Sequence, residues 1–402
     1  MKKIIVVLLA LSAFNSQLSW AQSDEQVKKT LDEQGQIISQ LQKEVSQLKN
    51  DRDNSKEFTL PESLRWLERT TIYGDLRLRH ETIEAENDDK MDRHRGRYRA
   101  RIGVKTKIND QWSTNFRFAT GGSSATSTNQ TMGDGFSTKD LGLDLAYLTY
   151  SPELIDGLNV TGGKMKNPFY LPGKSSLIWD SDVTPEGAAI NYDLQLDDNI
   201  SLFANGGTFW AQESSGDVDA SLWGAQLGTK IKINADNEFI TGATLYDYGN
   251  IKGSTIGGLD MKGNTPDIAG NYANDYQIFE AFAQYNTHIG SMPFSVAGDY
   301  VNNLEADNND TGWLVGFTVN KAKNPGSWQV SYDYRDLEAD AVLGGLSDGD
   351  FIGGGTNGKG HRIAGVYQIA KNIQTAVSYF CDQRSDDEND YRVLQFDLIV
   401  KF

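Results

Sequence analysis

Apolar residues recur at every second position in a series of segments from residue 71 to the C-terminus. The last segment shows the pattern fully, because Leu394, Phe396, Leu398, Val400 and Phe402 are separated by residues of which only one is apolar. A helix repeats every 3.6 residues and cannot produce this period, so each segment is predicted to be a β-strand with one apolar face. Sixteen segments can be counted, near residues 71–81, 94–108, 111–119, 139–150, 157–166, 186–195, 199–210, 220–233, 237–248, 275–288, 292–301, 311–321, 326–335, 360–370, 372–380 and 391–402.

The connections between these segments alternate between short and long. Seven short connections lie at residues 109–110, 151–156, 196–199, 234–236, 289–291, 322–325 and 370–372. Eight long connections, polar and rich in Gly and Asp, lie at residues 82–93, 120–138, 167–185, 211–219, 249–274, 302–310, 336–359 and 381–390. This alternation is typical of an up-and-down barrel in a membrane, with both chain ends on the short-turn side.

The sequence therefore predicts an all-β membrane fold, a sixteen-stranded antiparallel transmembrane β-barrel over residues 71–402. A count of about 14 to 18 strands is compatible with the pattern. Each spanning strand takes ~9–11 tilted residues, which this region supplies with comparable length left for loops. Sixteen strands enclose a water-filled channel instead of a packed interior, so a pore is the expected function.

Composition and motifs exclude several other classes. The net charge of −17 argues against nucleic-acid binding, and the single cysteine, Cys381, excludes a disulfide framework and a multi-cysteine metal site. No phosphate-binding loop, zinc-hydrolase motif or Cys-x-x-Cys occurs, so no catalytic residue, metal or cofactor is predicted. A barrel hydrolase with a Ser-His pair is the rival hypothesis, but the alternation places no serine beside any of the four histidines.

The N-terminus has the pattern of an export signal followed by a helix. Lys2 and Lys3 precede an apolar core and Ala21 ends a cleavage-type sequence, which predicts a signal peptide over residues 1–21. Residues 22–57 are predicted to form a coiled-coil segment, and residues 58–70 a linker with a short helix. Apolar residues occupy heptad core positions at Val27, Leu31, Ile38, Leu41, Val45 and Leu48, with Gln34 filling the gap. The alternatives are one amphipathic helix packed on the barrel, or a tether to cell-wall material.

A concentration of basic residues is predicted on one wall of the lumen. Within the first three strands, apolar side chains take one parity and are assigned to lipid, which assigns the other parity to the lumen. The inward set is Arg77, Arg79, Arg97, Arg99, Arg101, Lys105 and Arg117. Such a local charge concentration is expected to set the electric field of the pore. Alternatively, these residues pair with acids on neighbouring strands or in the loop at residues 82–93.

The long connection at residues 167–185 carries more apolar surface than a loop in water usually does. It combines Phe169, Tyr170 and Trp179 with Asp180 and Asp182. A loop folded into the barrel, with apolar residues against the wall and acids toward the lumen, explains both features. The predicted constriction therefore comprises Phe169, Tyr170, Lys174, Trp179, Asp180, Asp182 and Glu186. A loop that caps the barrel outside or contacts another subunit is the alternative.

Three stretches of the chain resemble a known family. They are Gly163-Lys164-Met165-Lys166-Asn167-Pro168-Phe169, the strand entry Pro185-Glu186-Gly187-Ala188-Ala189, and the terminal strand ending in Phe402. The chain resembles Gram-negative outer-membrane porins, in particular the broad putative-porin family with an N-terminal coiled coil before the barrel. The resemblance implies passive diffusion of small hydrophilic solutes and ions, and it implies that the terminal Phe402 serves as an assembly signal.

The same resemblance implies which residues face each other. In general porins the third loop folds inward against a basic wall, which here implies that Asp180, Asp182 and Glu186 face Arg77, Arg99, Arg101 and Arg117. Phosphate-selective porins place lysines on this loop, whereas this loop has only Lys174, with Lys164 and Lys166 at its base, which argues against strict anion specificity. A substrate-selective, anion-preferring channel is the alternative function. We expect a homotrimer in the outer membrane, in contact with lipid and lipopolysaccharide and with its coiled coil in the periplasm.

Overall fold

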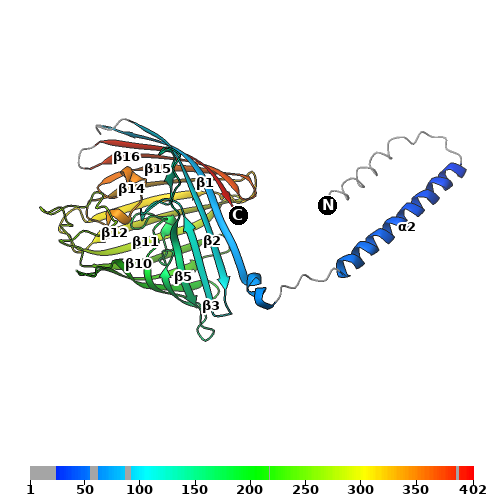
Figure 1. Cartoon of the computed structure of the whole chain (residues 1–402), viewed down its shortest axis with the longest axis horizontal. Coiled ribbons are helices and arrows are strands. Elements are labelled where there is room, and N and C mark those ends of the chain that lie inside the picture. The colour runs from blue at the N-terminus through cyan, green and yellow to red at the C-terminus, as the bar shows by residue number, and fades with distance from the viewer. Residues whose placement is uncertain (1–23, 55–61, 87–91, 217, 386–388) are drawn as a thin grey trace. The chain divides into compact units, whose positions relative to one another are not determined.

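The computed structural model describes residues 24–54, 62–86, 92–216, 218–385 and 389–402. The chain divides into two units between Arg65 and Trp66, and the second unit is a closed β-barrel (Figure 1). The predicted signal peptide lies outside the described residues.

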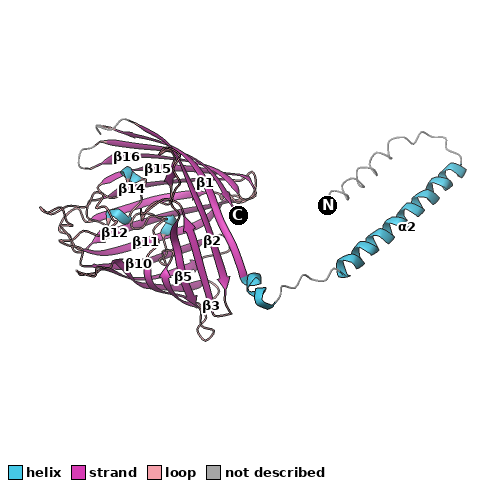
Figure 2. Ribbon diagram, in the orientation of Figure 1, coloured by secondary structure: helices cyan, strands magenta, loops and turns pink. Residues whose placement is uncertain are grey.

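The barrel wall is one antiparallel sheet whose strands follow each other in chain order (Figure 2). The strands are β1 (Thr70–Ala85), β2 (Arg93–Lys107), β3 (Trp112–Ala119), β4 (Gln130–Thr131), β5 (Gly142–Tyr150), β6 (Leu158–Lys164), β7 (Glu186–Gln195), β8 (Ile200–Gln212), β9 (Ala220–Lys232), β10 (Glu238–Gly249), β11 (Tyr276–Ile289), β12 (Met292–Asn303), β13 (Thr311–Val319), β14 (Trp328–Leu337), β15 (Gly358–Ala370), β16 (Ile373–Arg384) and β17 (Asp390–Lys401). β17 pairs with β1 and closes the barrel. The two-residue β4 pairs with β2 beyond the end of β3, so sixteen strands within the described ranges form the wall, as predicted.

Side chains alternate between the two faces of the wall as the period of two requires. In β1, Ile72 is 63% exposed on the outside, whereas Asp75 is 9% exposed on the inside. Exposed Leu, Phe, Trp and Ile side chains cover the outer face because the solvent there is lipid, and polar groups collect inside. The long connections gather at one end of the barrel and the short turns at the other, where β1 begins and β17 ends (Figure 1).

Phe402 lies at the seam of the barrel. Its backbone N–H donates to the Gly74 carbonyl at 3.1 Å, and its own carbonyl accepts from the Gly74 N–H at 3.0 Å. The Phe402 ring covers Gly74 so closely that a Cβ there would lie 2.6 Å from the ring. The last residue therefore extends the pairing between β17 and β1.

The first unit contains the helix α2 (Asp24–Asn54), and the 3-10 helix η2 (Glu62–Arg69) precedes β1. Within α2, the side chains of Ile38, Leu41 and Val45 are exposed. None of the helices in the described residues has the length and hydropathy needed to cross a membrane.

Candidate functional site in the barrel lumen

A cavity of about 990 Å³ runs inside the barrel beside β1, β2 and β11–β17. Its lining extends from the short-turn end, at Asp236 and Lys321, to the long-loop end, at Arg95 and Asp350. Among the described residues, ten basic side chains line it: Arg77, Arg79, Arg95, Arg97, Arg99, Lys174, Lys262, Lys321, Arg335 and Arg362. Seven acidic side chains line it: Asp180, Asp182, Asp236, Glu238, Asp333, Asp348 and Asp350. The residues that line the cavity therefore include more basic than acidic side chains, while Asp75, Glu81 and Asp397, which pair with several of these arginines, lie behind the lining.

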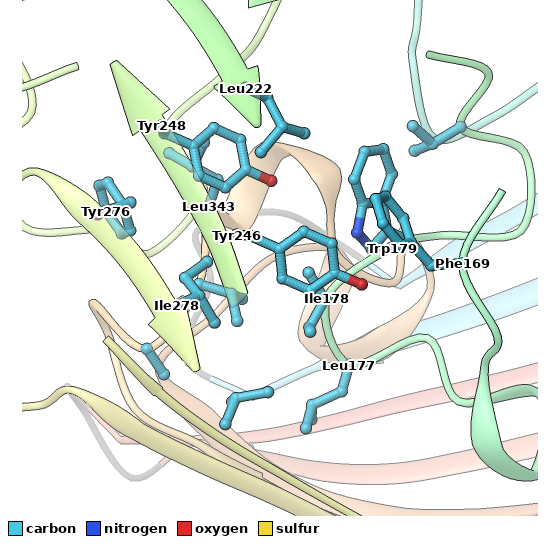
Figure 3. Packing of buried hydrophobic residues seen from close by; sticks show 14 of the residues in the cluster. Phe169, Leu177, Ile178, Trp179, Leu222, Tyr246, Tyr248, Tyr276, Ile278 and Leu343 are labelled. Carbon is cyan, nitrogen blue, oxygen red and sulfur yellow. The ribbon is translucent and has the colours of Figure 1, made fainter. Parts of the chain in front are cut away.

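The connection between β6 and β7, loop 165–185, lies inside the barrel and packs against the wall (Figure 3). Phe169 and Trp179 are buried, with ring centroids 5.0 and 6.1 Å from that of Tyr246 on β10. Gly224 of β9 makes room for this contact, because a Cβ there would lie 2.4 Å from the Phe169 ring. Apolar burial therefore holds the loop within the lumen.

Tyr170 and Lys174 lie on the part of this loop that reaches the cavity. The Tyr170 hydroxyl donates to Gln284 Oε1 at 2.7 Å, and its ring packs between Phe203 and Phe282. Lys174 ends the 3-10 turn η3 (Pro172–Lys174) and lines the cavity. This turn contacts β11, β12 and β13, so the loop spans from one wall toward another.

A second long connection also folds inward, which the sequence analysis missed. Loop 338–357, between β14 and β15, is mostly buried and packs Val342, Leu343 and Phe351 against loop 165–185 and the wall. Its apolar residues are Ala339, Ala341, Val342, Leu343, Leu346, Phe351 and Ile352. This is the same composition signal that identified the other inward loop, so the sequence did contain the information.

Hydrogen bonds join the two inward loops. The Asp180 N–H donates to the Leu346 carbonyl at 2.7 Å, and the Gly349 N–H donates to Asp180 Oδ2 at 2.9 Å. The Ser176 hydroxyl donates to Asp348 Oδ2 at 2.9 Å. Burial, and then the nearby Asp348 carboxylate, raise the pKa of Asp180 to about 8. Asp180 lines the cavity, but its carboxylate binds backbone N–H groups and faces none of the arginines within ion-pair distance, which corrects the expectation from the sequence.

Asp182 does face the basic wall. Its Oδ1 lies 3.7 Å from Arg99 Nη1 and 3.6 Å from Arg101 Nη1. On the other side, Asp75 accepts from Arg99 at 2.9 Å and from Arg101 at 2.6 Å. Burial alone would raise the pKa of Asp182, but Arg99, the Thr128 N–H and Arg101 outweigh burial and lower it. Two arginines and two aspartates therefore meet where loop 165–185 approaches β2.

The other predicted basic residues differ in how they are neutralised. Arg79 Nε donates to Asp397 at 2.7 Å, and Arg117 Nε donates to Asp144 at 2.5 Å. Both arginines therefore pair with acids on neighbouring strands, which is the alternative interpretation of the sequence. Arg101, Lys105 and Arg117 do not line the cavity. Burial, and then the positive charges of Arg117, Arg101 and Lys105, lower the pKa of Lys166 at the start of loop 165–185.

The prediction for Glu186 is wrong. Glu186 is the first residue of β7 and shares the outward parity of Ile190, which is 46% exposed. It lies opposite Lys164 in the register of β6 and β7, and its Oε1 is 2.8 Å from Lys164 Nζ. The carboxylate therefore lies on the outer face of the barrel and does not face the arginines.

Comparison with known proteins follows this geometry. Residues 82–264 and 265–402 match the family described as putative porin. The chain belongs to this family. Among solved structures, Pseudomonas putida OprB shares the fold at a TM-score of 0.56, with 10% identity over 84% of this chain and 96% of that one. A triple mutant of Rhodopseudomonas blastica porin aligns at a TM-score of 0.48, with 12% identity over 83% of this chain and 100% of that one.

No curated protein matches the chain. Family membership and the closed barrel together make this porin an outer-membrane channel for passive diffusion of small hydrophilic solutes, and they point away from an enzyme. Within the described residues, no group of three or more His, Cys, Asp or Glu could hold a metal ion.

Proposed function

We propose that loops 165–185 and 338–357 together constrict the channel and that the basic wall gives it a weak preference for anions. The observation that carries this proposal is the group Asp75, Arg99, Arg101 and Asp182, in which an acid from the inward loop meets arginines of the wall. Opposite charges across a narrow passage create a transverse field, which orients dipolar solutes without binding them tightly.

The balance of charge along the cavity supports the anion preference. Ten basic and seven acidic side chains line it among the described residues, although the whole chain carries −17. Fixed positive charge in a confined aqueous passage raises the local concentration of anions and excludes cations. Lys174 is the single lysine of the inward loop that lines the cavity, so this preference arises mainly from the wall.

Single-channel conductance in a planar bilayer tests the constriction. We expect deletion of residues 173–181 to raise the conductance while the barrel still folds, because the loop no longer occupies the lumen. The matched control deletes residues 134–137, which are exposed at the tip of the connection between β3 and β5. Equal conductance for the wild type and the 173–181 deletion contradicts the proposal.

A homotrimer is part of the proposal. The strands β3 and β6 are short, with 8 and 7 residues against ~9–11 residues for a spanning strand. On the outer face of the same region lie Gly162 and the ion pair of Lys164 with Glu186, which lipid solvates poorly. We expect two further copies to cover this region, with lipid and lipopolysaccharide contacting the rest of the outer face. Gly162→Trp should convert trimers to folded monomers on an unheated gel.

The helix α2 supports the same assembly. Its described side chains are exposed, including Ile38, Leu41 and Val45 along the predicted heptad seam. An exposed apolar seam on a 31-residue helix is buried most simply by the same helix of other subunits, in the periplasm. Deletion of α2 should therefore lower oligomer stability and leave the conductance of each barrel unchanged.

A further inference from the structure

We propose that the lumen contains a binding site for a small oxyanion, the carboxylate or phosphate group of a solute, between Arg77 of β1 and Arg97 of β2. This inference rests on the proposed passage of solutes through the cavity and goes beyond a general anion preference, because it assigns saturable binding to two named residues. Both side chains line the cavity.

The strand register gathers like charges at this point of the wall. Arg77 lies directly opposite Arg99, and Arg79 lies directly opposite Arg97. Like charges in directly opposed positions destabilise a sheet, so four arginines in two adjacent cross-strand pairs need anionic partners.

Within the described part of the chain, two of the four arginines have close carboxylate partners, and the other two do not. Arg79 donates twice to Asp397, at 2.7 and 2.8 Å, and Arg99 donates twice to Asp75, at 3.0 and 2.9 Å. Arg77 has no carboxylate oxygen within 4 Å among the described residues. Among the described residues, Arg97 has one ion pair, in which its Nη1 lies 3.7 Å from Glu81 Oε2. Glu81 also pairs with Arg95 and Arg79.

Hydrogen-bonding capacity is left over at the same two residues. The Nε atoms of Arg77 and Arg97 are buried and have no hydrogen-bond partner. A buried donor without an acceptor is costly, so neither guanidinium group is fully satisfied by the described residues, and both side chains line the cavity from which an oxyanion can approach their outer nitrogen atoms.

Neutral groups from the connection between β3 and β5 hold the two guanidinium groups in place. Arg77 Nη2 donates to Asn129 Oδ1 at 2.5 Å, and Arg97 Nη2 donates to Ser127 Oγ at 3.2 Å. These contacts orient the side chains without neutralising them. Ser127 and Asn129 also line the cavity, so they provide polar groups beside an oxyanion bound by the arginines.

Guanidinium groups suit carboxylate and phosphate because their planar fork can donate two parallel hydrogen bonds. A channel needs binding that is strong enough to favour entry and weak enough to allow exit. A water-filled lumen, with Glu81 and Asp182 close to the neighbouring arginines, limits the affinity accordingly.

The test measures block of the chloride current by sodium phosphate and by sodium acetate, with full-length mature protein in planar bilayers at ~0.1 M salt, where screening is moderate. The wild type should show saturable block. Arg77→Gln and Arg97→Gln should each raise the half-blocking concentration about tenfold, as expected for loss of one charge-assisted contact. Arg77→Lys keeps the charge but loses the fork, so it should keep the reversal potential and weaken the block.

Lys321→Gln is the matched control, because it removes one positive charge from the cavity lining at the short-turn end. It should shift the reversal potential and change the half-blocking concentration less than twofold. Block by phosphate alone assigns the site to phosphate groups, block by acetate alone assigns it to carboxylates, and block by both shows that it takes either oxyanion.

Unsaturable block in the wild type, or equal effects of Arg77→Gln and Lys321→Gln, overturns the site while leaving the channel intact. Absence of any conductance in the folded wild-type protein would instead refute the channel function on which the site rests. Arg77→Lys keeps the test decisive if Arg77→Gln does not fold.

Discussion

Replacing Arg99 and Arg101 by alanine tests the proposed constriction most directly, because Arg99 lines the cavity and both arginines pair with Asp75 and Asp182. With Asp75 and Asp182 these residues form a group with two positive and two negative charges. The double variant leaves two carboxylates that no longer have their arginine partners. The passage should then favour cations, so the reversal potential should move in the cation-selective direction.

The size of the shift follows from the geometry. A unit charge about 4 Å from a passing ion contributes ~4 kcal/mol at an effective dielectric constant of about 20. If water and salt reduce the combined effect of the two arginines to ~0.7 kcal/mol per ion, their removal favours a cation and disfavours an anion by that amount, so the ratio of cation to anion permeability changes about tenfold. Under a tenfold salt gradient, a non-selective channel made tenfold cation-selective moves its reversal potential by about 40 mV, against a limit of about 59 mV.

The assay is the reversal potential of purified protein in a planar bilayer, with folding checked by heat-modifiable mobility on a gel. The matched control is Asp75→Asn with Asp182→Asn, which should shift the reversal potential by a similar amount toward anions. At ~1 M salt the screening length falls to about 3 Å, and both shifts should shrink. A reversal potential equal to that of the wild type at low salt would show that these arginines do not act on permeating ions.

Three further outcomes are expected. Phe402→Asp should prevent accumulation of heat-modifiable, folded protein on gels, because it replaces the ring that covers Gly74 at the barrel seam with a charge. Gly224→Ala should destabilise the fold by about 1–3 kcal/mol and lower the thermal midpoint, because it forces a Cβ against the Phe169 ring. Gly365→Ala is the control and should leave the midpoint unchanged, because no atom lies within 4 Å of its added Cβ. Because the pKa of Asp180 is raised from 3.8 to about 8, its contribution to stability is fully present below the lower value and is lost as the pH rises through about 8. Asp180→Asn should therefore reduce the fall in thermal midpoint between about pH 6 and pH 9, and an unchanged fall would contradict that assignment.

The wall was predictable because lipid outside and water inside impose a period of two on every strand that separates them. Strands β8 and β10 gave the weakest pattern, since glycines such as Gly207 and Gly242 stand where aromatic rings need space. The prediction for Glu186 failed because it was carried over from the resemblance to general porins, whereas the alternation within residues 186–195 places Glu186 on the same outward face as Ile190.

Contacts between loops were beyond the reach of periodicity. The carboxylate of Asp180 and the backbone of Gly349 lie 169 positions apart in the chain, and local composition does not reveal that they pair. Composition did reveal that loop 165–185 is too apolar for water, and the same criterion applied to residues 338–357 would have found the second inward loop. The signal peptide, the coiled coil and the trimer stay predictions.

The hydrogen bonds between the two inward loops also indicate the order in which parts of the barrel assemble. Ser176 binds Asp348, a residue 172 positions later, and Arg79 binds Asp397, 318 positions later. Contacts of such sequence separation form late, because the intervening chain must be ordered first. Loop 165–185 therefore lacks its partner until β14 has joined the sheet, and the lumen stays open along one side until β17 meets β1. An arrested intermediate would leak solutes that the finished protein excludes, so a cell that makes this barrel benefits from inserting it only when nearly complete.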